Sequence, residues 1–152
     1  MSALPGRSSV PIFAYTDGVA TGMSDVIALV ARIHIAQLLF LTALSASPTT
    51  GYLTSLGVPS PALWSSIAVA AEWITAFSLI FGVATRYGAL LGTLYVLIAT
   101  ALAHRYWEYP QAQQMAQYTH FIKNLAIMGG LLLLFVYGAG RFSIDRMLAE
   151  KR

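Results

Sequence analysis

Two charged side chains stand inside otherwise apolar segments, and they are the first candidates for chemistry. Arg32 interrupts the first long apolar segment and Glu72 interrupts the second. If these segments cross a bilayer, an unpaired charge at its centre costs about 2.5–3.5 kcal/mol on insertion scales. We therefore expect Arg32 and Glu72 either to pair with each other or to serve a buried polar site.

Depth along the helices favours the pair. Arg32 stands twelve residues before the end of its segment at position 44, and Glu72 stands ten residues after the start of the next at position 62. At ~1.5 Å per helical residue, the two depths agree within about one turn. We predict a buried Arg32–Glu72 ion pair. It is a structural bridge that fixes which helices touch, or else it forms the charged floor of a buried polar pocket or provides a carboxylate that handles protons.

A second polar set gathers where the third apolar segment ends and the fourth begins. It comprises Thr100, His104, Trp107, Gln117, His120, Lys123 and Asn124. Positions three or four apart share a helical face. Thr100 and His104 therefore lie on one stripe with Thr93 and Leu97, and a second stripe consists of Gln117, His120 and Asn124, with Lys123 beside it. His104 is the candidate catalytic residue, since imidazole is the side chain that exchanges protons near neutral pH.

These residue types suit the head group of a quinone, which needs a hydrogen-bond donor at each carbonyl and an apolar slot. His104 and His120, on separate helices, could instead bracket a haem or bind copper. We do not expect such a metal site, because the sequence has no cysteine, no paired carboxylates and no His-x3-His pair. Anchoring at the membrane interface is the plain alternative, and it explains Trp107 but not the deeper Asn124.

The segments that position these residues are four apolar stretches of about the length that spans a bilayer, ~20 residues. They run over 26–44, 62–84, 87–103 and 121–137. Backbone groups inside lipid must satisfy their own hydrogen bonds, so these spans are helices. The composition agrees, because only 10% of residues are charged against about 25% in soluble proteins. We predict an all-α, antiparallel four-helix transmembrane bundle.

Basic residues set the expected topology. Six of them fall on one side of the spans, namely Arg7, Arg86, Arg141, Arg146, Lys151 and Arg152, whereas Arg105 and Lys123 fall on the other. The positive-inside rule then places both termini in the cytoplasm. We expect a cytoplasmic leader at 1–24 with no signal peptide, a membrane domain at 25–137, and a basic cytoplasmic tail at 138–152 with a short amphipathic helix.

Local signals mark the ends of the elements. Ser24 and Asp25 form a plausible cap for the first span, and Pro61 suits the first position of the second. The short link at Thr85 forces spans two and three into a hairpin, and Gly88 with Gly92 allows close helix packing. We expect 45–57 and 111–117 to be connecting segments.

The sequence also excludes several classes of function. Without cysteine, the chain forms no disulfide and supplies no thiolate. The nine Lys and Arg residues are few and scattered, so we expect no nucleic-acid partner. No glycine-rich phosphate loop or nucleophile elbow is present.

An ordered set of motifs carries a family resemblance. It consists of 56–61 (LGVPSP), Glu72, Gly82 with Thr85 and Arg86, Ala99 with Thr100, His104, Trp107, 121–126 (FIKNLA), Gly129 with Gly130, and 138–145 (GAGRFSID). The set resembles the DoxX family of small four-helix membrane proteins. Where the family usually has Ser-Gly and a following Lys after the first span, this chain has 45–48 (SASP).

The resemblance implies a link to quinone-dependent sulfur oxidation, as in the membrane subunit of thiosulfate:quinone oxidoreductase. Other members accompany partners in redox stress or metal homeostasis. By position, Arg32, Glu72, His104, Lys123 and Asn124 match the family's intramembrane polar set.

We therefore expect a quinone-linked oxidoreductase subunit in the bacterial inner membrane, with a polar pocket in the outer half of the bundle. That pocket would be lined by Arg32, Glu72, Thr100, His104, Trp107, Lys123 and Asn124. The alternative is a non-catalytic accessory subunit of a larger membrane redox complex, and a small-solute carrier ranks third. Membrane lipid, a protein partner and a second copy of the chain are the expected partners.

Overall fold

The computed structural model describes residues 11–45 and 47–151, and every regular element in these residues is helical. Four helical segments are long and apolar enough to cross a membrane: Met23–Leu44, Pro61–Phe81, Thr85–Glu108 and Gln111–Tyr137. The predicted fold class, an all-α bundle of four transmembrane helices, is thereby confirmed.

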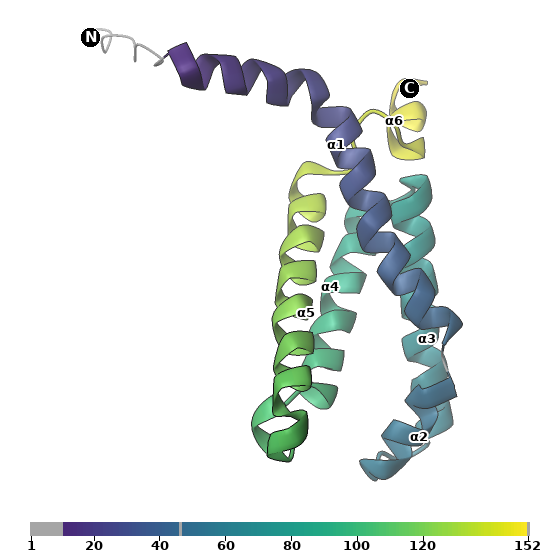
Figure 1. Cartoon of the computed structure of the whole chain (residues 1–152). Coiled ribbons are helices and arrows are strands. Elements are labelled where there is room, and N and C mark those ends of the chain that lie inside the picture. Colours follow the sequence, from purple (N-terminus) through teal and green to yellow (C-terminus); the bar gives the residue numbers. More distant parts are fainter. Residues whose placement is uncertain (1–10, 46, 152) are drawn as a thin grey trace, which may run out of the picture.

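The four long helices pack in a closed order. Helix α1 (Pro11–Leu44) contacts α3 (Pro61–Phe81), α3 contacts α4 (Thr85–Ala103), α4 contacts α5 (Gln111–Tyr137), and α5 returns to α1. Figure 1 shows them side by side along one axis. Their shared core consists of Ala36, Leu39, Ala76, Leu79, Ala89, Val96, Leu131 and Leu134.

The two ends of the bundle carry different short elements. We call the end with α6 (Ile144–Ala149) the tail end, and the end with α2 (Ser47–Ser55) and the 3-10 turn η1 (Tyr106–Glu108) the loop end. Figure 1 places α6 and α2 at opposite ends of the bundle. The positions of the candidate site residues are given relative to these two ends.

Helices α3 and α4 form a tight hairpin at the tail end. Gly82 ends α3 in the left-handed conformation, with φ of 64°, a geometry that glycine adopts without steric cost. Further along, Gly88 lies against Ser78, and Gly92 lies against Thr75, where a Cβ on either glycine would collide with the facing side chain. These small residues let the two helices approach closely, as lipid-embedded helices require.

Three segments differ from the prediction. Helix α1 begins at Pro11, so it runs through the expected cap at Ser24 and Asp25. Segment 45–57, expected to be a loop, contains the nine-residue helix α2. Helix α5 begins at Gln111, directly after Pro110, and so includes the expected connector. The apolar stretches locate the part of each helix inside lipid, but the backbone can extend a helix beyond it.

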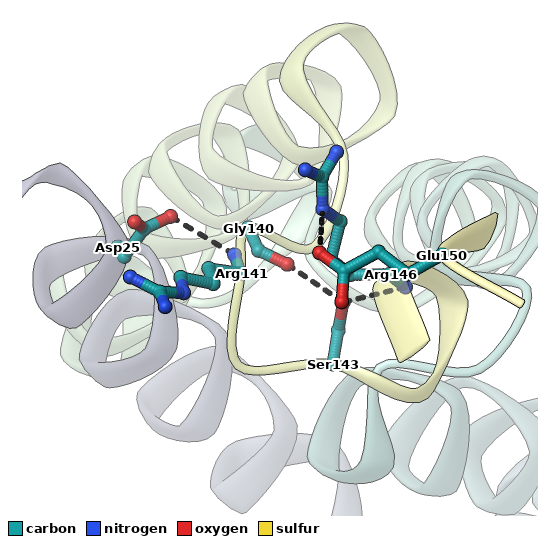
Figure 2. A network of polar contacts seen from close by, with 6 residues as sticks. All are labelled: Asp25, Gly140, Arg141, Ser143, Arg146 and Glu150. Carbon is teal, nitrogen blue, oxygen red and sulfur yellow. Dashed lines mark hydrogen bonds and ion pairs between the residues drawn. The ribbon is translucent and has the colours of Figure 1, made fainter. Parts of the chain in front are cut away.

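The chain crosses the tail end after α5 through residues 138–143, which we call the tail strap. Its Arg141 N–H donates to Asp25 Oδ1 at 2.9 Å, so Asp25, which lies inside α1, holds the strap instead of capping a helix. Ser143 Oγ donates to the Gly140 carbonyl at 2.6 Å and accepts from the Arg146 N–H at 3.2 Å, capping α6 as a helix N-cap should. Figure 2 shows this network.

Candidate functional site

The predicted polar residues fall into three separate groups along the bundle. Arg32 lies at the tail end, Glu72 lies in the middle, and the other members lie toward the loop end. The single pocket expected from the sequence is therefore divided, and each group has its own partners.

Arg32 is almost completely buried, with 1% of its surface exposed. Its Nη1 donates to the Ala139 carbonyl at 2.8 Å, and its Nη2 donates to the Phe142 carbonyl at 2.7 Å. Arg32 therefore holds the tail strap against α1. Charge-assisted bonds of this kind are about twice as strong as neutral ones.

The predicted Arg32–Glu72 ion pair is not formed. Among the described residues, the ion pairs are Arg105–Glu108 and Arg146–Glu150. Arg32 lies beside Gly82, and Glu72 is ten residues earlier on α3, a separation of about 15 Å along the helix.

The error came from assuming that the first two spans end at the same level. Twelve residues of α1, about 18 Å, separate Arg32 from the helix end at Leu44. The 21 residues of α3 before Gly82 cover about 31 Å. Helix α2, which also packs on α3, occupies the difference at the loop end.

Glu72 pairs with a residue that the sequence analysis did not single out. Its Oε1 accepts a hydrogen bond from the Tyr95 hydroxyl at 2.6 Å, and the carboxyl group belongs to a residue with only 5% exposure. Tyr95 stands ten residues after Thr85, and Glu72 stands ten residues before Gly82. Equal distance from the hairpin was the signal that could have found this pair.

The loop-end group joins α4 to α5 through two side-chain hydrogen bonds. His104 Nδ1 lies 2.8 Å from Gln117 Oε1. One turn deeper, Asn124 Nδ2 donates to Thr100 Oγ1 at 2.8 Å, and Thr100 in turn donates to the Val96 carbonyl. The two stripes predicted from the sequence therefore face each other.

The two histidines of this group stack on one another. The ring centroids of His104 and His120 are 5.0 Å apart, and the planes are inclined by 17°. Lys123 lies close enough for its charge to act on His120, and both side chains are exposed on the bundle surface. We call His104, His120 and Lys123 the basic cluster.

Aromatic residues surround the basic cluster at the loop end. Trp107 is 57% exposed and packs edge-on against Tyr106 at 5.0 Å and Phe121 at 6.2 Å. Its surroundings are thus those of an interfacial aromatic belt. Among the described residues, the contacts of Trp107 are to other aromatic rings and not to the basic cluster, so it belongs to the edge of the site.

Helix α2 closes the loop end beside α4. The Tyr52 hydroxyl donates to the Leu102 carbonyl at 2.8 Å, and Tyr109 donates to the Ala103 carbonyl at 3.0 Å. Burial, with a smaller contribution from neighbouring Tyr109, raises the pKa of Tyr52 above its ordinary value. The Tyr52 phenol therefore remains a hydrogen-bond donor at neutral pH.

Known proteins match the chain over most of its length. It is 37% identical over 98 residues to inner membrane protein YphA of Escherichia coli strain K12, an alignment that covers 64% of this chain and 70% of the relative. It is 34% identical over 134 residues to inner membrane protein YqjF of the same organism, covering 85% and 97%. No solved structure matches the chain.

A family model also matches the chain. The DoxX model matches residues 26–105, which include Arg32, Glu72 and His104. With four membrane-spanning helices and two inner membrane relatives, the predicted location in the bacterial inner membrane is confirmed. On the family match and the two alignments together, this chain belongs to the DoxX family.

Proposed function

We propose that this DoxX protein is the membrane subunit of a quinone-linked oxidoreductase, and that its basic cluster binds the quinone head group. The observation that carries the proposal is the stacked pair of His104 and His120 with Lys123 beside it, at the loop end of two membrane-spanning helices. A quinone bound there would accept two electrons and two protons.

The side chains of the cluster suit a ligand with carbonyl oxygens. Gln117 Oε1 only accepts hydrogen bonds, so in this arrangement His104 Nδ1 carries the proton. Its Nε2 is then free to accept or relay a proton. Lys123 is unpaired with any carboxylate among the described residues, so its ammonium is available to a carbonyl oxygen.

The neighbouring polar residues position the cluster. The Asn124–Thr100 hydrogen bond fixes α5 against α4 one turn below His104. Gln117 orients the His104 ring. Arg32 and Glu72 lie outside this site, so their roles are in the framework of the bundle. The electrons would come from a donor or partner protein outside this chain.

A binding titration with a short-chain ubiquinone tests the proposal. Tryptophan fluorescence of the purified protein reports binding, and His104→Ala and Lys123→Ala are each expected to weaken it about tenfold, the loss of one hydrogen bond to a charged or polar group. His34→Ala is the matched control, because His34 is exposed and bonds only its own helix at Val30. Unchanged affinity in the His104→Ala/Lys123→Ala double variant contradicts the proposal.

A second candidate function is that of a non-catalytic accessory subunit. It is favoured by the way that His104, Gln117, Thr100 and Asn124 satisfy one another within the bundle. In that case, deleting the chain lowers the abundance of a partner complex, whereas His104→Ala and Lys123→Ala leave it unchanged. Quantitative proteomics of membranes from the deletion strain and the variants separates the two candidates.

A further inference from the structure

A groove of about 790 Å³ opens between α3 and α4 at the tail end, opposite the basic cluster. Its walls include Trp73, Phe77, Phe81, Val83, Tyr87 and Ile144. The volume lies within the range of about 300–1,000 Å³ that ligand sites occupy.

The lining of the groove is mostly apolar and suits a hydrocarbon chain. Its polar side-chain groups are the Trp73 indole N–H, the Tyr87 phenol and the Ser78 hydroxyl, and the hydroxyl already donates to the Val83 carbonyl at 2.7 Å. Along one wall, Trp73, Phe77 and Phe81 stack in succession, with centroids 5.3 and 6.1 Å apart. This ladder forms a rigid apolar track along the helix axis.

Exposed bases lie at the end of the bundle where the groove opens. Ile144 of α6 lines the groove, Arg146 stands two residues later on the same helix, and Lys151 follows the end of that helix. Four bases are exposed at this end: Arg86, Arg141, Arg146 and Lys151.

Three described carboxylates offset part of this charge. Asp145 accepts two backbone N–H groups at the start of α4, Asp25 accepts the Arg141 N–H, and Glu150 pairs with Arg146 Nε at 2.8 Å. The four exposed bases, together with buried Arg32, outnumber these acids, so the described part of the tail end keeps a net positive charge.

We propose that the groove and the bases beside it form a binding site for one phospholipid with an anionic head group. One acyl chain lies along the aromatic ladder, and the head-group phosphate contacts Lys151 and Arg146. The apolar lining and the membrane location favour the hydrocarbon chain, and the excess of bases at the tail end favours an anionic head group. The site lies at the other end of the bundle from the basic cluster, so it does not depend on the quinone proposal.

Native mass spectrometry in micelles holding equal phosphatidylglycerol and phosphatidylcholine tests the head-group contact. We expect phosphatidylglycerol to be retained preferentially, and Lys151→Gln to reduce that preference about fivefold, the effect of one base near an anionic surface. Arg105→Gln, at the loop end, is the charge-matched control and leaves the preference unchanged. Equal retention of the two lipids, or equal effects of the two variants, overturns the proposal.

A second pair of variants tests the groove itself. Ile74 lines the groove and is 57% exposed, whereas Leu94 is 54% exposed on α4 and does not line it. Ile74→Trp is expected to fill the groove and abolish lipid retention, and Leu94→Trp to have no effect. A lipid-free dimer would mean that a second copy covers this face, and it would overturn the proposal, as would retention in Ile74→Trp equal to that in Leu94→Trp.

Discussion

Arg32 is a buried cation whose hydrogen-bond partners are backbone carbonyl groups. Removing its side chain leaves the carbonyls of Ala139 and Phe142 without donors inside the bundle. A hydrogen bond to a charged group contributes about 1.5–3 kcal/mol, so we expect Arg32→Ala to lower the free energy of unfolding by about 2–4 kcal/mol. Denaturant unfolding in detergent measures this loss.

Glu72→Gln is the informative comparison for Arg32→Ala. The amide oxygen of glutamine still accepts from Tyr95, so this variant is expected to unfold within about 1 kcal/mol of wild type. The effects of the two variants on the free energy of unfolding should add, because the two side chains share no partner. Arg32, on α1, lies at the level of Gly82, which is about 15 Å along the α3 axis from Glu72. A large coupling energy in the double variant would instead indicate a direct ion pair.

The Tyr95–Glu72 hydrogen bond makes a separate prediction. Tyr95→Phe leaves a buried carboxyl group without its donor, which costs about 1–3 kcal/mol. Replacing both partners by apolar residues removes the unsatisfied group, so Tyr95→Phe/Glu72→Leu is expected to regain most of that stability. Unfolding of the two variants in the same detergent decides the point, and a double variant less stable than Tyr95→Phe alone would contradict it.

Sequence reasoning identified the two buried charged residues Arg32 and Glu72 but wrongly paired them with each other. A charge in an apolar span can be recognised from the sequence, because its cost in lipid does not depend on the fold. Its partner depends on how far one helix is shifted along another. The short hairpin between α3 and α4 fixes the relative levels of Glu72 and Tyr95. The relative levels of Arg32 and Glu72 depend instead on the long connecting segment that contains α2.

At the scale of elements, α6 completes the first turn of α4. Asp145 Oδ1 accepts from the Ala84 N–H at 2.7 Å, and Oδ2 accepts from the Thr85 N–H at 2.9 Å. Its own N–H donates to the Gly82 carbonyl at 2.9 Å. Asp145 therefore acts as an N-cap supplied from another part of the chain, satisfying N–H groups that a helix start leaves open.

Loss of this cap should fray the start of α4. We expect Asp145→Ala to cost about 0.5–2 kcal/mol, as other N-cap substitutions do, and to speed hydrogen exchange at the amides of Ala84 and Thr85. Glu150→Ala serves as the control, because its ion pair with Arg146 is exposed and such pairs contribute little. Equal exchange in both variants would show that Asp145 does not hold the helix start.

Helix α2 is an element that could not be predicted from its own sequence. Its sequence, SPTTGYLTS, has few apolar residues and no helical periodicity. It folds beside α3, and Tyr52 attaches it to the end of α4. Tertiary contacts of this kind override local propensity, and this one short element shifted the predicted depth of Arg32.

At the scale of the molecule, the apolar pattern predicted the four helices because bilayer thickness fixes their length. It also predicted that polar residues of the third and fourth spans gather near the same end of the bundle, and in the structure His104 lies beside Gln117 and Thr100 beside Asn124. It could not predict that the polar residues divide into three groups, because that division requires the relative levels of all four helices.

The orientation of the bundle in the membrane is a prediction for the whole molecule. The described tail end carries four exposed bases, Arg86, Arg141, Arg146 and Lys151, against Arg105 and Lys123 at the loop end. The positive-inside rule therefore places the tail end in the cytoplasm. Because the chain contains no cysteine, a single introduced thiol reports its side without background.

Ala149 and Ala112 are exposed positions at the two ends of the bundle. In intact spheroplasts, a membrane-impermeant maleimide is expected to label Ala112→Cys and not Ala149→Cys, and inverted vesicles are expected to reverse the pattern. The opposite pattern would turn the bundle over and place the basic cluster on the cytoplasmic face. The electron donor of the proposed quinone site would then have to be a cytoplasmic protein or metabolite, so this measurement also sets where that donor is sought.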